Sequence, residues 1–183
     1  LRIVAAQRMV RRKRPDALID LLLRARELVP SGIALQAEVV GDGPAREGLV
    51  RRLEVDGVDW ISLPGRVTRK QLRDLHWRSH VFVSAARLEA FGIAALEART
   101  AGLALVVREG TGARDFVSMG LSGLLADTDD GLAEAVARLA TRPTLLAKLQ
   151  QHNRRVPPAE DWPIVVKSTV AEYRRAQQQA TVR

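Results

Sequence analysis

The chain has 183 residues, of which 46% are hydrophobic and 27% are charged, a composition that suits one globular domain with a core of its own. It contains no cysteine, which excludes disulfides and thiolate metal sites, and its apolar runs are too short for a membrane-spanning helix or the apolar centre of a signal peptide. The formal net charge of +8 favours anionic partners, and nucleic acid, an acidic membrane face and phosphorylated small molecules all stay open.

Short apolar runs alternate along the chain with longer helical patterns. The predicted strands are Arg2 to Ala6, Leu35 to Val40, Trp60 to Leu63, Val81 to Ser84, Leu103 to Val107 and Gly123 to Leu125. Near-continuous apolar strands are typical of a sheet that is covered on both faces. The order therefore predicts an α/β fold, a doubly wound (Rossmann-like) parallel sheet of about six strands with helices on both faces.

The spacing of polar and apolar residues also predicts where helices begin and end. Thr68 and Gln71 have the spacing of a capping box at the start of a helix. After Gly131 the pattern is helical only, with a break at Pro157-Pro158 and a last amphipathic segment from Trp162 to about residue 178. We expect one domain over residues 1–183, made of an α/β core at 1–127 and C-terminal helices at 128–183.

The loops after the strands are the places to search for a site, because open α/β sheets bind ligands at the carboxyl ends of their strands. Five such loops follow the predicted strands, at residues 7–14, 41–44, 64–68, 85–92 and 108–115. The fourth and the first of them carry the residue types with the clearest chemistry.

In the fourth loop, two carboxylates frame an apolar segment. Glu89 precedes a helix that we expect to start near Gly92, and Glu97 falls about a turn and a half inside it. Because a helix start is an anion site, the amides of Phe91, Gly92 and Ile93 can hold a phosphate, with the two acids free to bind neutral hydroxyls. The alternative is that Glu89 is simply exposed and Glu97 an ordinary helix residue, and their spacing alone favours neither reading.

The first loop contains the basic run Gln7 to Arg14. Arg8 and Lys13 follow the first strand and can reach the same crevice. The interaction energy between a cation and a phosphate in such a crevice is much larger than that of an exposed surface ion pair. Arg11, Arg12 and Arg14 are better explained as a solvated basic run, or as a contact for nucleic acid or anionic lipid.

Together these pieces resemble the C-terminal, donor-binding domain of the retaining glycosyltransferases with the GT-B fold, in glycosyltransferase family 4, also called glycosyl transferases group 1. The resemblance covers nearly the whole chain and rests on an ordered set of motifs rather than on one of them. The motifs are Arg8 with Lys13 five residues later, V-V-G-D-G-P at Val39 to Pro44, Gly65-Arg66-Val67, the E-x₇-E element from Glu89 to Glu97, and S-G-L-L at Ser122 to Leu125.

This resemblance implies a role for each matching residue. Arg8 and Lys13 would neutralise the donor diphosphate, assisted by the amides of Phe91, Gly92 and Ile93. Glu97 would bind the ribose, and Glu89 would bind the transferred sugar and act as the catalytic residue. Arg66 and Val67 would lie near the base.

The resemblance also implies a partner and a reaction. The substrate would be a nucleotide sugar, a UDP- or GDP-sugar, and the reaction would need no cofactor and no metal. The N-terminal acceptor domain of the family is missing from these residues, so we expect the chain to be an excised domain that is inactive in isolation. The location would be cytoplasmic, with peripheral association to a membrane left open, and nucleic acid is not an expected partner.

Several positions depart from the family pattern. Gln7 and Arg14 stand where glycine commonly flanks the basic pair, and Ala85-Ala86 replaces a common Pro-Ser. These departures leave open a non-catalytic nucleotide-sugar-binding module on the same fold. The many arginines leave open a second alternative, a basic binder of nucleic acid or membrane surfaces. Asp127-Thr128-Asp129 resembles a metal-binding D-x-D motif, but its place before a helix favours a helix cap.

Overall fold

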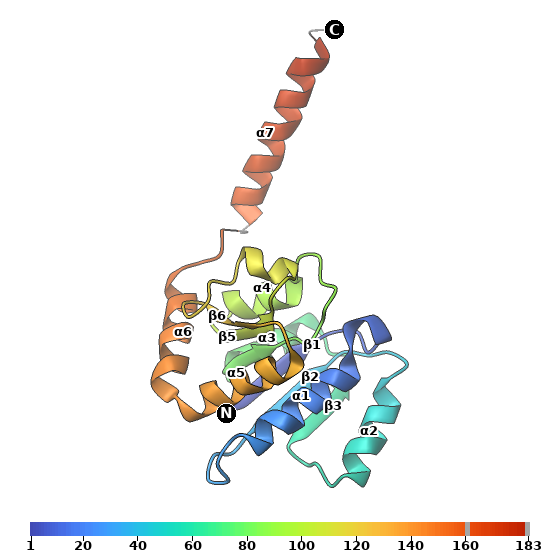
Figure 1. Cartoon of the computed structure of the whole chain (residues 1–183). Coiled ribbons are helices and arrows are strands. Elements are labelled where there is room, and N and C mark those ends of the chain that lie inside the picture. The colour runs from blue at the N-terminus through green and yellow to red at the C-terminus, as the bar shows by residue number, and fades with distance from the viewer. Residues whose placement is uncertain (160–161, 182–183) are drawn as a thin grey trace.

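A computed structural model of the chain describes residues 1–159 and 162–181 and contains a six-stranded parallel sheet (Figure 1). The strand order is β3-β2-β1-β4-β5-β6. The strands are β1 (Arg2–Ala6), β2 (Gln36–Val40), β3 (Ile61–Gly65), β4 (Val81–Val83), β5 (Ala104–Arg108) and β6 (Gly123–Ala126). The predicted α/β fold is confirmed, and the strand limits differ from the prediction by at most two residues at either end.

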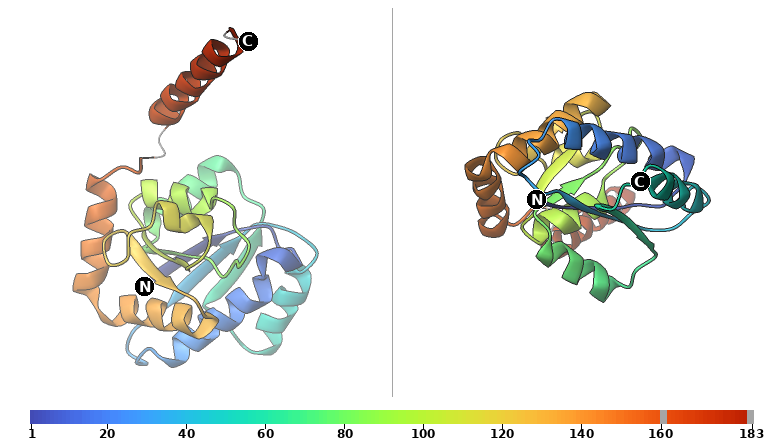
Figure 2. Two further views of the ribbon diagram at one scale, coloured as in Figure 1. Left: turned by 45° about the horizontal axis from the view of Figure 1, so that its top comes forward. Right: turned by 90° about the horizontal axis from the view of Figure 1, so that it is seen from below.

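Helices cover both faces of the sheet, as Figure 2 shows. The helices are α1 (Pro15–Glu27), α2 (Arg46–Val55), α3 (Arg69–Arg78), α4 (Ile93–Thr100), α5 (Asp129–Thr141), α6 (Pro143–Arg155) and α7 (Trp162–Thr181), with short 3-10 turns η1 (Arg11–Lys13) and η2 (Gly112–Asp115). The core on one face contains buried residues of α1, α2, α5 and α6, and the core on the other contains those of α3, α4 and η2.

The strand side chains alternate between these two cores. In β1, Ile3 and Ala5 belong to the first core and Val4 to the second. All five residues of β5 are buried, including the arginine that ends it, Arg108. A near-continuous apolar strand is what a sheet covered on both faces requires, which is why such runs could be recognised in the sequence.

The local helix signals behave as predicted at two places. Thr68 and Gln71 form a reciprocal capping box at the start of α3. Thr128 caps α5, with its hydroxyl accepting from the Gly131 amide at 3.0 Å, so the interpretation of the Asp127–Asp129 segment as a cap is confirmed for Thr128. On α3, Trp77 is 66% exposed, and the Arg73 guanidinium lies over its ring, 4.8 Å from the ring centroid.

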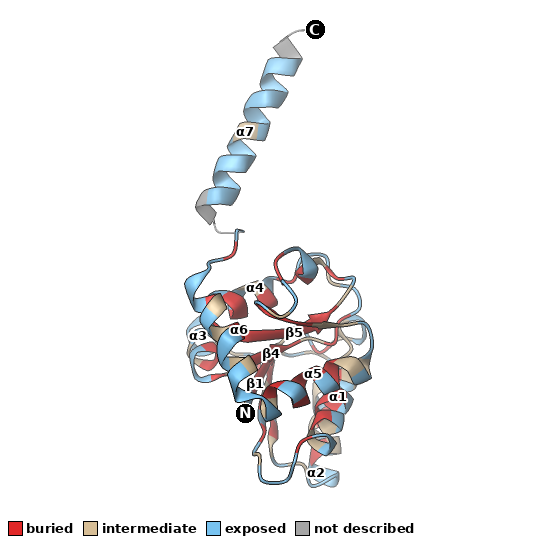
Figure 3. Cartoon of the chain, turned by 60° about the vertical axis from the view of Figure 1, so that its left-hand side comes forward, coloured by how far each residue is buried: buried red, intermediate tan, exposed pale blue. Residues whose placement is uncertain are grey.

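The C-terminal helices differ in how they meet the sheet. Asn153 of α6 is buried and donates to the carbonyls of Leu103 and Ser122, at 2.6 and 2.8 Å, which ties α6 to the sheet. In Figures 1 and 3 α7 extends away from the α/β body, and Val166, Val170 and Tyr173 are exposed along it. Among the described residues no helix is both long and apolar enough to cross a bilayer.

Candidate functional site

The site lies where the chain reverses its direction of travel across the sheet. From β1 the chain proceeds outward through β2 to β3, and it then returns to place β4 beside β1 on the other side. The loops that leave the carboxyl ends of β1 and β4 therefore diverge to opposite faces of the sheet, which opens a crevice between them. This reversal places the first and fourth predicted loops together.

A cavity of about 370 Å³ occupies this crevice. Its lining comes from the ends of β1, β4 and β5 and from the start of α4. The polar side chains of the lining are Gln7, Lys13, Ser84, Glu89, Arg108 and Thr111. The volume falls in the range of about 300–1,000 Å³ that is usual for small-molecule sites.

Lys13 and Glu89 meet across the crevice. The Lys13 ammonium donates to Glu89 Oε2 at 2.5 Å, and the two side chains are 16% and 28% exposed. This contact joins the loop after β1 to the loop after β4, 76 residues apart in sequence. The cation and the carboxylate that were predicted for phosphate and sugar are thus neighbours in one cavity.

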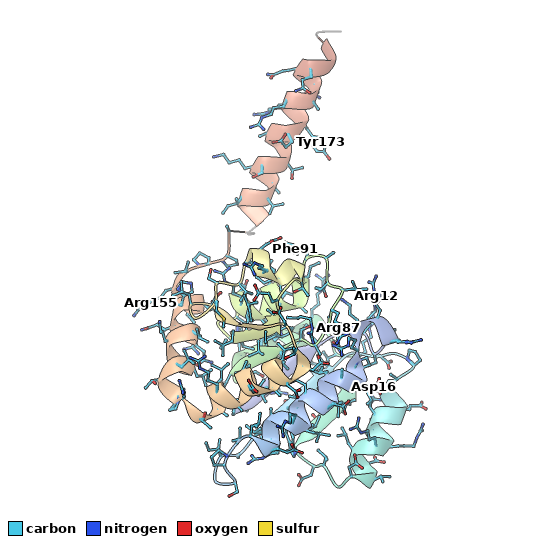
Figure 4. The ribbon with its side chains drawn as sticks, viewed as in Figure 1. Arg12, Asp16, Arg87, Phe91, Arg155 and Tyr173 are labelled. Atoms are coloured by element: carbon cyan, nitrogen blue, oxygen red, sulfur yellow. The ribbon has the colours of Figure 1, made fainter. Side chains whose placement is uncertain are left out.

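The start of α4 forms another wall of the cavity, which Phe91, Gly92 and Ile93 line. Gly92 has φ of +90°, a left-handed conformation that favours glycine, and no side chain caps the helix. The first backbone N–H groups of an α-helix have no acceptor within the helix, so this end offers donors and partial positive charge to the cavity. Phe91 lies against Phe116, with ring centroids 5.7 Å apart, and Figure 4 shows it beside α4.

The remaining predicted residues lie outside the lining of this cavity. Arg8 is exposed in the loop after β1, and Glu97 is exposed on α4, one turn beyond Ile93. Arg66 is exposed and Val67 half-buried after β3, which is three strands away from β4. Their predicted roles are not tested by this arrangement and stay predictions.

A second ionic group, absent from the sequence predictions, begins at Arg14, the residue that follows Lys13. Asp129, the first residue of α5, accepts from Arg14 through both carboxylate oxygens, at 2.9 and 2.6 Å, and also from Arg108. Arg14 additionally donates to the carbonyl of Ala85 at 3.1 Å, and Arg108 to that of Asp127. The hydrogen bonds from Arg14 lower the pKa of Asp129, and the same contact raises the pKa of Arg14. We call Arg14, Arg108 and Asp129 the arginine clamp.

The clamp and the lining residue Gln7 were not recognised as parts of a site from the sequence. Arg14 was read as part of a solvated basic run, and Gln7 only as a departure from a glycine, because neither residue type marks a site by itself. Arg108 ends an apolar strand, and a charged residue at the carboxyl end of a strand in an open α/β sheet is a signal that could have identified it. Among the described residues, no group of three or more histidines or carboxylates is placed to hold a metal ion.

Comparison with known proteins identifies the family. Residues 2–156 match the family model described as glycosyl transferases group 1. The chain belongs to this family. The glycosyl transferases group 1 match spans every element from β1 to α6, so it includes both sides of the crevice and the arginine clamp.

Individual relatives agree with this assignment. The chain is 28% identical to one of the phosphatidylinositol N-acetylglucosaminyltransferase subunits of Arabidopsis thaliana, over 95% of this chain and 38% of the relative. It is 33% identical to a GDP-mannose-dependent alpha-(1-6)-phosphatidylinositol monomannoside mannosyltransferase from Mycobacterium tuberculosis, over 75% of this chain and 37% of the relative. The chain therefore spans less than half the length of these two relatives.

Solved structures of GT-B glycosyltransferases share the fold. The structure of Anabaena Alr3699/HepE in complex with UDP-glucose superposes with a TM-score of 0.78 at 19% identity, over 96% of this chain and 48% of that one. At this level of identity the likeness establishes the architecture, one half of a GT-B fold, and the chemistry has to be argued from the residues of the crevice.

Proposed function

We propose that the chain is the donor-binding domain of a retaining, metal-independent glycosyltransferase, which transfers a sugar from a UDP- or GDP-sugar to an acceptor. The observation that carries the proposal is the crevice itself. An uncapped helix start, a lysine and a carboxylate line one cavity at the point where strand order reverses. The family assignment and the names of the relatives support a glycosyltransferase.

The diphosphate of the donor would lie at the start of α4. There it would accept from the amides of Gly92 and Ile93, and Lys13 would supply a full positive charge. A cation about 4 Å from a phosphate contributes on the order of 4 kcal/mol at an effective dielectric constant near 20. The left-handed conformation of Gly92 and its lack of a side chain leave the helix start open to such a ligand.

The Lys13–Glu89 ion pair has to be exchanged when the donor binds. A phosphate oxygen would replace Glu89 as the partner of Lys13, and sugar hydroxyls would replace Lys13 as the donors to Glu89. Each charged group then keeps a hydrogen-bonding partner, so neither is left buried and unpaired, which would cost about 1–3 kcal/mol or more.

During transfer, the bond between the anomeric carbon of the sugar and the phosphate oxygen would break, and its electron pair would leave with the diphosphate. The oxygen of an acceptor hydroxyl would bond to the anomeric carbon, and the hydroxyl proton would pass to the departing diphosphate. The charge that develops there would be stabilised by Lys13 and the α4 helix start, and by Arg8 once the donor is bound. These groups would take the place of a metal ion. Glu89 would act on the transferred sugar as the catalytic residue, Glu97 would bind the ribose, and Arg66 and Val67 would lie near the base.

A second domain would complete the enzyme. The two relatives named above are more than twice the length matched here, so the acceptor site and the other wall of the cleft would lie in a preceding domain. The exposed apolar residues of α7, Val166, Val170 and Tyr173, would be available to contact it. The names of both relatives contain phosphatidylinositol, which supports an acceptor at a membrane surface and a peripheral association with it.

Binding of UDP and GDP to the chain tests the donor site. Saturation-transfer NMR detects weak ligands, so it suits a domain that lacks part of its cleft. We expect one of the nucleotides to bind, and Lys13→Ala to weaken it about tenfold or more, since a charge-assisted contact contributes about 1.5–3 kcal/mol. The matched control is Lys70→Ala, which removes an exposed lysine of α3 outside the cavity.

Two outcomes would count against this function. A folded chain that binds neither nucleotide contradicts the donor site as a whole. Binding that is equally strong in wild type and Lys13→Ala contradicts the crevice as its location. Transfer or hydrolysis of a nucleotide sugar by a protein that contains both domains would exclude the non-catalytic binding module.

A further inference from the structure

Arg108 is buried at the edge of the cavity in an unusual environment for an arginine. It is 5% exposed, ends the otherwise apolar strand β5, and belongs to the cavity lining. Its terminal nitrogens donate to the Asp127 carbonyl and to Asp129 Oδ1. Its Nε is buried and has no hydrogen-bond partner within the part of the chain that the structure describes.

The positive charge of Arg108 is only partly compensated. Asp129 is its one carboxylate partner in the described structure, and Arg14 binds both oxygens of the same group. Arg87 adds a further positive charge near both Arg108 and Asp129. Burial lowers the pKa of Arg108, although Asp129 acts in the opposite direction. A buried charge without full compensation is costly, and in a cavity it is typical of a binding site for the opposite charge.

A second side chain of the lining also has a buried donor nitrogen without a hydrogen-bond partner. Gln7, at the end of β1, has a buried Nε2 without a hydrogen-bond partner among the described residues. The unpartnered side-chain nitrogens of Gln7 and Arg108 thus lie on the two sides of β4, and both are hydrogen-bond donors. Two lining side chains whose donors are not fully satisfied within the described residues favour an acceptor-rich ligand in this cavity.

The order of the strands indicates which part of the ligand meets Arg108. If the proposed function holds, the base lies after β3 and the diphosphate at the start of α4, which follows β4. The transferred sugar, bound by Glu89, then lies in the cavity whose lining also includes the end of β5, the strand next to β4. Arg108 is the residue that ends β5.

We infer that Arg108 forms an anion subsite for the transferred sugar, so that the donor carries a carboxylate on that sugar, as a nucleotide-linked uronic acid does. The carboxylate lies beside the Arg108 guanidinium and the diphosphate beside Lys13. Asp129, the first residue of α5, holds the Arg108 guanidinium in place by accepting a hydrogen bond from it. This inference rests on the proposed function and adds the class of the sugar.

Donors that differ only in this carboxylate test the subsite. Dissociation constants are measured by saturation-transfer NMR for UDP-glucuronate and UDP-glucose, or for GDP-mannuronate and GDP-mannose, according to the base that binds. The wild-type chain should bind the acidic donor about tenfold or more tightly. Arg108→Met should bring the ratio close to one, while Arg108→Lys, which keeps the charge, should retain most of it.

The matched control is Arg24→Met. Arg24 is an exposed arginine of α1 that pairs with Glu27 and is not part of the cavity lining, so this variant should keep the affinities for both donors and their ratio. Equal affinities of the wild-type chain for the two donors would overturn the subsite, and so would a ratio that survives in folded Arg108→Met. No binding of either nucleotide or of any of these donors would instead contradict the proposed function.

Discussion

At the scale of single residues, Arg14 shows how the chain accommodates an unfavourable backbone conformation. It is the one non-glycine residue with positive φ in the described structure, at +55°, and it directly follows Lys13. A left-handed conformation costs an L-residue roughly 1–2 kcal/mol. The side chain of Arg14 offsets this cost, since it binds Asp129 through two hydrogen bonds and is only 22% exposed.

This balance predicts a difference between two substitutions. Arg14→Ala removes the ion pair and keeps the strain, whereas Arg14→Gly removes both. We therefore expect Arg14→Gly to be more stable than Arg14→Ala by about 1 kcal/mol, and both to be less stable than wild type, in urea unfolding measured by circular dichroism.

A control separates this effect from the general loss of an arginine. Arg24 pairs with Glu27 on the exposed face of α1, where the side chains are 51% and 65% exposed, so Arg24→Ala should change the free energy of unfolding by no more than about 0.5 kcal/mol. If wild type and Arg14→Gly were equally stable, the hydrogen bonds from Arg14 to Asp129 would stabilise the chain by no more than the left-handed backbone conformation of Arg14 costs.

At the scale of elements, the loop that carries Glu89 is held in place by η2. The Gly112 amide donates to the Glu89 carbonyl at 2.8 Å, and a Cβ on Gly112 would lie 1.9 Å from the carbonyl oxygen of Ala90. Real atoms do not approach so closely, so only glycine allows η2 to pack on this loop. The Phe91–Phe116 contact holds the same two segments together.

Adding one methyl group at this contact should therefore separate the two segments. We expect Gly112→Ala to lower the free energy of unfolding by about 1–3 kcal/mol and to speed hydrogen exchange of the loop amides from Glu89 to Gly92. The control is Gly48→Ala in α2, where nothing lies within 4 Å of the added Cβ and stability should stay level or rise by up to about 1 kcal/mol. Unchanged exchange in Gly112→Ala would contradict the role of η2.

The elements were predictable from the sequence to a greater extent than the contacts between them. Strands such as β1 and β5 are continuous apolar runs, and the start of α4 follows from Gly92, so local patterns were sufficient. The pairing of Arg14 with Asp129 joins residues 115 positions apart. No local pattern encodes such a contact, because it depends on how the first, fourth and sixth strands align at one edge.

At the scale of the whole molecule, the net charge of +8 supports two different readings. One is a general attraction to polyanions, and the other is a built site for a small anion. In the structure, some of the basic side chains are exposed at the surface and others line the cavity. Arg11 and Arg12 are exposed, and Figure 4 shows Arg12 at the edge of the molecule where α1 begins. The side chains of Lys13 and Arg108, in contrast, are only 16% and 6% exposed and line the cavity.

Salt should affect these two groups differently. Binding to a polyanion through exposed arginines releases condensed counterions, so we expect the affinity for duplex DNA, measured by fluorescence anisotropy, to fall about 100-fold or more between 50 and 200 mM salt. Nucleotide binding should weaken much less, because partly buried charges are screened less than exposed ones. DNA binding that stays tight at 200 mM salt, with nucleotide binding absent, would favour the nucleic-acid reading, since a groove built for a polyanion would then have to exist outside the crevice.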